Sequence, residues 1–151
     1  MISYYEGDLL KSGCDVIAHQ VNEYGVMGAG LAAQIKEKFP KVFIAYRDMC
    51  EACREKGLNL YGTIHAIQIG KDKYIANCFT QRNGTTDYEL LRVAVTQLRG
   101  MALMNNIKTI GIPYKYGCGI AQGDWKTVEK IWTDAFKDSA IELQIWKLEE
   151  K

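Results

Sequence analysis

Short apolar runs alternate along the chain with longer segments in which apolar residues recur every three or four positions. The short runs have the length and flanking turn residues of strands, of which 16–21 and 109–113 have the apolar character of buried ones, and the longer segments have the spacing of one helix face. The runs predicted as strands are 2–5, 16–21, 63–69, 74–79, 109–113 and 141–148. The segments predicted as helices are 31–39, 41–56, a segment that opens with the capping box Thr86-x-x-Glu89 and ends at Asn105, and a segment that follows the N-cap Asp124.

This alternation predicts an α/β protein. Strands separated by helices favour parallel pairing, whereas the runs 63–69 and 74–79 are joined only by Gly70–Lys73 and suit an antiparallel hairpin. We therefore expect a three-layer α/β/α fold around a central mixed sheet. The sequence contains no repeat and no linker, so we expect a single domain over residues 1–151.

One segment, 15–39, combines a strand, a glycine-rich turn and a helix start. Gly28-Ala29-Gly30 follows the turn residues 22–25 and leads directly into helical spacing. The first amides of a helix lack partners within it and lie at the positive end of its dipole, so such a turn can bind an anion. A tight strand-to-helix turn without a ligand explains the segment equally well. The pattern is neither a P-loop nor a G-x-G-x-x-G fingerprint.

A second glycine-rich loop, 116–123, follows the buried run 109–113 and precedes the last helix. In an open α/β sheet, such loops lie beyond the carboxyl ends of the strands, where ligands bind. Neither 25–32 nor 117–125 contains a basic residue, so the positive potential would come from backbone amides. Together the two loops predict a site in which the main chain holds the diphosphate of a nucleotide.

Composition narrows the class of protein. Apolar residues make up 48% and charged residues 25% of the chain, as in an ordinary globular protein, and no apolar run approaches the length of a membrane span. The formal net charge of +1 gives no electrostatic signal for nucleic acid. The N-terminal residues lack the pattern of a signal peptide.

The five cysteines favour a reducing compartment, because their number is odd and no export signal is visible. We therefore expect a cytoplasmic protein. Cys50 and Cys53 form a C-x-x-C, but they lie within a predicted helix and lack a second pair of zinc ligands, so packing explains them better. His19 and His65 are the only histidines, and we expect no metal site.

Several motifs, taken jointly and in order, resemble the macrodomain family of ADP-ribose-binding proteins. The resemblance covers essentially the whole chain and points to the branch of ADP-ribose-1″-phosphate phosphatases and terminal ADP-ribose protein glycohydrolases. The motifs are Gly7-Asp8-Leu9, Ala18-His19-Gln20-Val21-Asn22, Met27-Gly28-Ala29-Gly30-Leu31-Ala32, Pro113, Gly117-Cys118-Gly119-Ile120, Asp124-Trp125 and Trp146.

The resemblance implies that these residues bind ADP-ribose. It places Asp8, with the Leu9 backbone, at the adenine amino group and Trp146 against the adenine ring, and it assigns Asn22 to the distal ribose. Without the resemblance, Asp8 is a turn residue, Trp146 packs in the core and Asn22 forms an Asx turn. The residues implied for the two phosphate and ribose loops are Gly28, Ala29 and Gly30, and Gly117, Cys118, Gly119, Ile120 and Ala121.

The resemblance also bears on the chemistry. The glycohydrolase relatives use a lysine that forms a covalent adduct with the opened ribose and an aspartate that resolves it. These positions fall on Gln81 and Ala121, whose side chains cannot perform that chemistry. His19 matches a histidine of the phosphatases and suits general acid–base work, but a buried neutral histidine bonded to backbone is an equal alternative. The amide-rich loop could lower the pKa of Cys118, although packing is the preferred explanation for that residue.

The expected function is that of a hydrolase acting on ADP-ribose derivatives at C1″ of the distal ribose, with His19 and Asn22 positioning the reacting end. The alternative is a reader module that binds ADP-ribose without turnover, which the missing lysine and aspartate favour. We expect no cofactor and no membrane partner. Nucleic acid is expected only as an ADP-ribosylated substrate, and the protein is expected to be a monomer.

Overall fold

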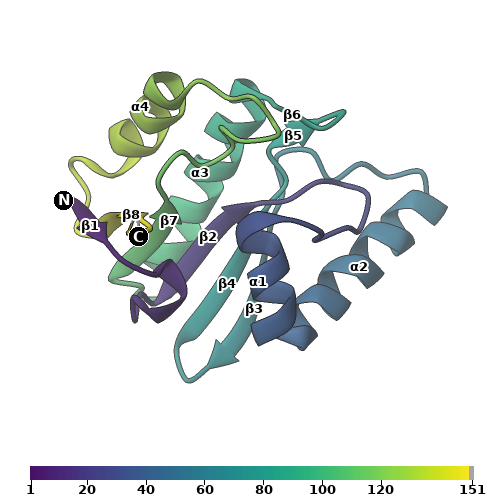
Figure 1. The fold of residues 1–151 in the computed structure, drawn as a ribbon, viewed down its shortest axis with the longest axis horizontal. Coiled ribbons are helices and arrows are strands. Elements are labelled where there is room, and N and C mark those ends of the chain that lie inside the picture. The colour runs from purple at the N-terminus through teal and green to yellow at the C-terminus, as the bar shows by residue number, and fades with distance from the viewer. Residues whose placement is uncertain (150–151) are drawn as a thin grey trace.

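The computed structural model describes residues 1–149 and has a mixed sheet between two layers of helices (Figure 1). Six strands form this sheet in the order β1-β8-β7-β2-β4-β3. Their bounds are Ile2–Glu6 (β1), Val16–Gln20 (β2), Ile64–Gly70 (β3), Lys73–Cys78 (β4), Thr109–Pro113 (β7) and Glu142–Lys147 (β8). Neighbouring strands are parallel except for β3, which pairs antiparallel with β4. The predicted three-layer α/β/α fold and the 63–79 hairpin are confirmed.

Two pairs of helices cover the two faces of the sheet (Figure 1). The helices are Gly30–Lys38 (α1), Pro40–Glu55 (α2), Tyr88–Met104 (α3) and Trp125–Phe136 (α4). On one face, Ile35 of α1 and Val42 of α2 pack with Ile17 of β2. On the other face, Leu98 of α3 and Trp132 of α4 belong to the largest buried cluster. Each helix therefore packs apolar residues of its predicted face against the sheet.

Strand β2 lies inside the sheet and is buried on both faces. Val16 and Ala18 belong to the cluster beneath α3 and α4, whereas Ile17 belongs to the cluster beneath α1 and α2. Because successive side chains alternate, His19 lies on the same face as Ile17, and Gln20 lies on the same face as Ala18. A strand buried in this way has an unbroken apolar run, which is the feature that marks it in the sequence.

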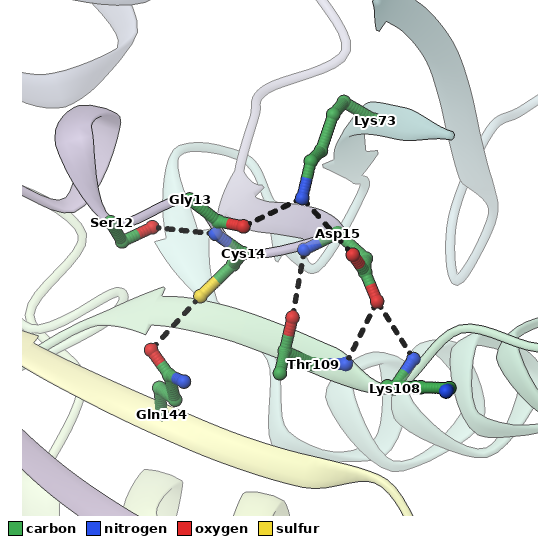
Figure 2. Close-up of polar contacts among 8 residues, drawn as sticks. All are labelled: Ser12, Gly13, Cys14, Asp15, Lys73, Lys108, Thr109 and Gln144. Carbon is green, nitrogen blue, oxygen red and sulfur yellow. Dashed lines mark hydrogen bonds and ion pairs between the residues drawn. The ribbon is translucent and has the colours of Figure 1, made fainter. Parts of the chain in front are cut away.

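The amino ends of three strands are joined through Asp15, which precedes β2 (Figure 2). Its carboxylate accepts hydrogen bonds from the backbone amides of Lys108 (2.9 Å) and Thr109 (3.3 Å), and it pairs with Lys73 Nζ at 3.1 Å. Burial by itself would raise the pKa of Asp15, but these contacts outweigh it and lower the pKa. This end of the sheet is thus fastened by side chains, and the opposite end opens into the glycine-rich loops.

A short hairpin that the sequence analysis did not predict lies between β4 and α3. Its strands are Gln81–Arg82 (β5) and Thr85–Thr86 (β6). Asn83 and Gly84 form the two-residue turn with φ angles of 53° and 78°. A type I′ turn requires this left-handed pair, and the Asn-Gly dipeptide is its usual sequence signal. This signal is present in the sequence, in a segment for which no strand is predicted.

The predicted capping box Thr86-x-x-Glu89 is wrong. The N-cap of α3 is Asp87, whose Oδ1 accepts a hydrogen bond from Leu90 N at 3.0 Å. The hydroxyl of Thr86 instead donates to Gly117 O at 2.6 Å. The helix begins one residue later than the capping box predicts, and the Thr86 side chain makes tertiary contacts in place of a local cap.

Cys50 and Cys53 lie apart from the predicted site, and the helices are short. All five cysteines are free, and Cys50 is buried within a cluster that Cys53 also contacts, so the C-x-x-C is a packing feature of α2. Within residues 1–149, none of the helices has both the length and the apolar character needed to cross a membrane.

Candidate active site

A cleft beyond the carboxyl ends of the adjacent parallel strands β2 and β7 is lined by both glycine-rich loops. It consists of two adjoining pockets with volumes of about 330 and 360 Å³. The structure therefore brings the two loops together, as the sequence analysis expected. The residues that line both pockets are Gln20, Ala29, Ala32, Gln81, Ile120 and Ala121.

The first loop is shaped by Asn22. Asn22 Oδ1 accepts hydrogen bonds from Tyr24 N (2.9 Å) and Tyr46 Oη (2.7 Å), and Asn22 Nδ2 donates to Val26 O (2.9 Å). These contacts form an Asx turn that is fastened to α2. Asn22 lines one of the pockets, but its amide is engaged with the loop itself.

The first loop ends at a helix start that has no side-chain cap. Ala29 is the N-cap of α1 and makes no side-chain hydrogen bond, and Gly30 has a φ of +56°. Gly30, Leu31 and Ala32 all line the cleft. The first amides of a helix lack intrahelical partners and lie at the positive end of the dipole, so this wall of the cleft suits an anionic group.

The second loop is fastened to the β5–β6 hairpin through Thr86. Thr86 N donates to Ala121 O (3.0 Å), and Thr86 Oγ1 donates to Gly117 O (2.6 Å). Gly117 has a φ of +69°, and a Cβ atom there would lie 2.7 Å from Thr86 Oγ1. A Cβ atom at Gly123 would lie 2.6 Å from Gly117 O. Both positions therefore require glycine because the loop is closely packed.

A row of polar side chains that the sequence analysis did not assign supports the second loop. Gln20 Nε2 donates to Thr86 Oγ1 at 3.0 Å, and Gln20 Oε1 accepts from Thr80 Oγ1 at 2.6 Å. Thr80 Oγ1 also lies 2.7 Å from Tyr116 Oη, and both of these residues are buried. Buried polar groups need internal partners, so the row fixes several side chains at once. Single Gln and Thr residues carry little sequence signal, because most of them lie on protein surfaces.

His19 lines the cleft and is almost fully buried, with 3% of its surface exposed. Its Nε2 lies 2.7 Å from Asn77 Oδ1 on β4, so its partner is a side chain and not the backbone. Burial disfavours the charged imidazolium and lowers the pKa of His19 to about 4, although the contact with Asn77 acts in the opposite direction. The ring is therefore neutral near pH 7 and suits hydrogen bonding better than proton abstraction.

Gln81 and Ala121, at the positions that the resemblance assigns to a catalytic lysine and aspartate, both line the cleft. Arg82 follows Gln81 in sequence, but its Nε pairs with Asp87 at 3.2 Å. Its guanidinium also lies 4.4 Å from the ring centroid of Tyr61. Arg82 is thus engaged outside the cleft and does not take the place of the lysine.

Three side chains near the second loop complete this description. The side chain of Cys118 packs against the core, which confirms the preferred explanation, and burial followed by the charge of Asp124 raises the pKa of its thiol, which contradicts the alternative of a lowered pKa. Asp124 is the N-cap of α4, as predicted, and accepts a hydrogen bond from Thr127 N at 3.1 Å. Lys115, two residues before Gly117, is a cationic residue that lines the cleft.

The residues expected at the adenine end meet where β1 and β8 end. Asp8 is the N-cap of a short 3₁₀ helix, Leu9–Lys11, and its Oδ1 accepts a hydrogen bond from Leu10 N at 2.9 Å. The ring of Trp146 stacks on Tyr5 with centroids 4.8 Å apart. A Cβ atom on Gly7 would lie 3.2 Å from that ring, so the residue before Asp8 lies close to Trp146.

These adenine-end residues do not line the two pockets. The side chain of Leu9 is buried in the core. Trp146 is the register partner of Pro113, which does line the cleft, so Trp146 lies on the strand next to the cleft. Across residues 1–149, no cluster of three or more His, Cys, Asp or Glu side chains is placed to hold a metal ion.

Comparison with known proteins identifies the family. The model of the Macro domain family matches residues 18–132, which is more than half of the chain. The matched region contains both glycine-rich loops and His19. The chain therefore belongs to the macrodomain family.

Individual relatives share the sequence at moderate identity. A DNA ADP-ribosyl glycohydrolase of Mycobacterium tuberculosis is 29% identical over 142 residues, which covers 91% of this chain and 39% of that protein. The chain thus spans about two fifths of the length of this relative. An ADP-ribose 1″-phosphate phosphatase of Scheffersomyces stipitis is 34% identical over 129 residues, which covers 73% of this chain and 72% of that protein.

A solved structure supports the same assignment. The macrodomain of Mycobacterium tuberculosis DarG superimposes with a TM-score of 0.85 at 28% identity, and the match covers 97% of each chain. The three-layer arrangement and the strand order described above are therefore those of a macrodomain.

Proposed function

We propose that this macrodomain binds ADP-ribose and hydrolyses a bond at C1″ of the distal ribose in ADP-ribose derivatives. One observation carries the proposal: the uncapped start of α1 and the second glycine-rich loop line one cleft. Backbone amides at such positions suit a diphosphate. The names of the mycobacterial and yeast relatives, a glycohydrolase and a phosphatase of ADP-ribose derivatives, support the reaction class.

The site residues follow from the two ends of the cleft. In this proposal the diphosphate lies between Gly28–Gly30 and Gly117–Ala121. The distal ribose lies at the pocket that Asn22 lines, and the adenine extends toward Asp8 and Trp146, with the Leu9 backbone beside Asp8. Because the Asn22 amide shapes its own loop, its contribution to the ribose would come chiefly through the loop that it holds.

The chemistry would proceed without the lysine adduct of the glycohydrolase relatives. Gln81 and Ala121 line the cleft but offer neither an amine nor a carboxylate. His19 is neutral because burial lowers its pKa to about 4, so it would act by hydrogen bonding to the reacting end. The attacking group would then be a water molecule ordered by His19 and by the phosphates of the ligand.

A reader module is the second candidate, and the same two residues favour it. If no other group activates water, a cleft with Gln81 and Ala121 would bind ADP-ribose without turnover. The two candidates share the binding step and differ only in product formation. They can therefore be separated by measuring both in one preparation.

The experiment combines calorimetry with a product assay. We expect heat of binding when ADP-ribose is titrated into the protein, and product when it is incubated with ADP-ribose 1″-phosphate, ADP-ribosylated DNA or ADP-ribosylated protein. Ala29→Trp places an indole in the cleft and should abolish both signals, whereas Met104→Trp, at the exposed end of α3, should preserve them. Binding without product from any substrate would establish the reader. No heat at millimolar ligand would refute the proposal.

We further infer that residues 1–151 form a single domain that acts as a monomer in the cytoplasm. Five free thiols support a reducing compartment. Nucleic acid would enter only as an ADP-ribosylated substrate, because the net charge of +1 supplies no general electrostatic attraction. Light scattering of the purified protein tests the oligomeric state.

A further inference from the structure

Alternate residues of β8 and β1 form one row of side chains at the edge of the sheet. Glu142, Gln144 and Trp146 lie on the same face of β8, because side chains alternate along a strand. Ser3 and Tyr5 of β1 are the register partners of Gln144 and Trp146. The row therefore begins at Glu142 and ends at the indole that the proposed function places at the adenine end of the cleft.

The side chain of Gln144 has a single orientation in this row. Its Oε1 accepts hydrogen bonds from Trp146 Nε1 at 2.9 Å and from Cys14 Sγ at 3.1 Å, and Figure 2 shows the contact with Cys14. Its Nε2 donates to Glu142 Oε1 at 2.6 Å. An indole N–H only donates and a carboxylate only accepts, so exchanging the amide oxygen and nitrogen would break both contacts. The orientation of Gln144 is thus fixed by its partners.

Glu142 connects this chain of hydrogen bonds to Tyr5. Its Oε2 accepts from Ser3 Oγ at 2.8 Å and from Tyr5 Oη at 3.4 Å. The hydrogen bonds from Gln144 and Ser3 lower the pKa of Glu142, so the group is a carboxylate near pH 7. The ring of Tyr5 in turn stacks on Trp146, with 15° between the two planes. The row therefore closes on itself, and the indole is held at its N–H and over one face.

Burial does not require this arrangement. Tyr5 is 39% exposed and Trp146 is only partly buried, so water could bond to the polar groups of both. Ordering side chains at a surface costs conformational entropy. The row spends its contacts on the orientation of one indole, and a preorganised ring binds a ligand at a lower entropic cost.

The indole also lies beside the residue proposed for the adenine amino group. A Cβ atom on Gly7 would lie 3.2 Å from Cζ3 of Trp146, and Asp8 follows Gly7. A rotated indole would therefore change the space next to the backbone that leads to Asp8. The orientation of Trp146 thus matters to both adenine contacts of the proposed site.

We propose that Gln144, Glu142 and Tyr5 are positioning residues that hold the Trp146 indole in place for the adenine ring of the ligand. This inference rests on the proposed function and adds residues that the family resemblance does not assign. Gln144 fixes the indole N–H, Tyr5 fixes one face, and Glu142 joins the two. Their effect is therefore confined to ligands that contain adenine.

Two ligands separate this positioning role from a general structural one. Ribose 5-diphosphate keeps the diphosphate and distal ribose of ADP-ribose and lacks the adenosine. Gln144→Leu, which removes the acceptor of the indole N–H, should weaken ADP-ribose binding about tenfold and change ribose 5-diphosphate binding less than about twofold. Calorimetric titration measures both affinities, by displacement for the weaker ligand. Equal losses for the two ligands, or no loss for ADP-ribose, would overturn the proposal.

Tyr5→Ala and Tyr4→Ala form a matched pair of variants. Both remove an exposed tyrosine of β1, but Tyr4 lies on the opposite face, where its hydroxyl donates to Glu129. Tyr5→Ala should reproduce the selective loss of ADP-ribose affinity, and Tyr4→Ala should leave both affinities unchanged. The same loss in both variants would assign the effect to the strand and contradict a role for the row.

Nitrogen NMR tests the row without a ligand. The chain has three tryptophans, so ¹⁵N-tryptophan labelling gives three indole signals, and Trp146→Phe identifies that of Trp146. We expect this N–H to exchange slowly with water in the unaltered protein and faster in Gln144→Leu. Exchange as fast as that of free indole in the unaltered protein would show that the row does not hold the ring.

The failure of this inference is distinguishable from that of the proposed function. A wild-type protein that binds no ADP-ribose refutes both. Normal ADP-ribose binding by Trp146→Ala refutes this inference alone, because the adenine ring would then lie elsewhere while the proposed binding site remains.

Discussion

The two glycine-rich loops of the cleft follow the same order of strand, loop and helix, but they are held in different ways. The first loop ends at Ala29, an N-cap that makes no side-chain hydrogen bond. The second loop ends at Asp124, which caps α4 with its own carboxylate. No side chain therefore competes with a ligand for the amides of the first helix start, whereas the Asp124 carboxylate already occupies the Thr127 amide of the second. The two helix starts of the cleft thus differ in their side-chain capping, as the N-cap Asp124 predicted in the sequence already indicated.

The glycines of the two loops also serve different purposes. A Cβ atom on Gly30 would meet no atom within 4 Å, whereas a Cβ atom on Gly117 would lie 2.7 Å from Thr86 Oγ1. Glycine at the first position keeps the cleft open, and glycine at the second allows the loop to pack on the hairpin. The comparison predicts that substitutions in the first loop act mainly on binding, while those in the second act mainly on stability.

The largest expected effect is that of Gly117→Ala. The added methyl group must displace Thr86, and alanine at a φ of +69° is strained, so the free energy of unfolding should fall by about 3 kcal/mol. Gly119→Ala is the matched control, because its Cβ atom would meet nothing within 4 Å and its φ is not positive; it should change stability by less than about 0.5 kcal/mol. Urea denaturation measures both. Equal losses would show that the second loop is not closely packed.

The second effect is a dependence of stability on pH. It arises from His19, which lies on β2, the strand that precedes the first loop. Burial lowers the pKa of His19 from 6.5 to about 4, so between these values the unfolded chain binds more protons than the folded chain. Stability should therefore fall as the pH drops through this window, by about 2 kcal/mol between pH 7 and pH 5. The second loop is supported by uncharged side chains that do not titrate in this pH range. They are those of Gln20, Thr80 and Thr86.

Comparison with a variant isolates this contribution. The pKa of His65 is also lowered by burial and acts with the same sign, so the pH dependence of the unaltered protein contains both histidines. His19→Gln should remove the larger share of the pH dependence and leave the remainder to His65 and the carboxylates. Urea denaturation of both proteins at the two pH values measures the difference. An unchanged pH dependence would show that His19 titrates normally in the fold.

The fold was predictable because its signals are local. Six short strand-like runs and four amphipathic segments identified the strands of the main sheet and the helices, with end errors of one or two residues. The hairpin at 81–86 was missed although Asn83-Gly84 is a strong turn signal. Its flanking residues are polar, and a search for apolar runs cannot find strands of two residues.

The site was predictable in part. The positions of both loops in the fold follow from the order of strands and glycines in the sequence. The side-chain hydrogen bonds that hold the loops cannot be inferred from that order. Thr86 was interpreted as a helix cap, and its hydroxyl instead holds Gly117, which lies 31 residues away. Such contacts depend on which segments meet in space, and a single sequence does not contain that information. For the same reason, His19 offered no sign that Asn77 is its partner.

The third prediction concerns the Thr86 hydroxyl, which holds the second loop. Thr86→Val keeps the shape of the side chain but leaves Gly117 O and Gln20 Nε2 without their partner, so it should cost about 1.5 kcal/mol of stability. Thr86→Ser retains the hydroxyl and should cost less. If the valine variant is as stable as the serine variant, the hydroxyl does not support the loop.

The smallest expected loss of stability belongs to Gly30→Ala, which completes the comparison. Alanine must adopt a φ of +56°, at a cost of about 1 kcal/mol, but its methyl group meets no protein atom. Because Gly30 lines the cleft at the uncapped start of α1, the same methyl group should hinder the ligand and weaken ADP-ribose binding about tenfold or more.

Gly28→Ala is the control for adding a methyl group to a glycine of the same loop. Its Cβ atom would lie an ordinary 3.5 Å from Val26, so this variant should fold normally. Calorimetric titration and urea denaturation of the same preparations give both quantities. A Gly30→Ala protein that binds ADP-ribose normally would remove the distinction between an open first loop and a packed second one, because the first glycine would then serve only the backbone conformation.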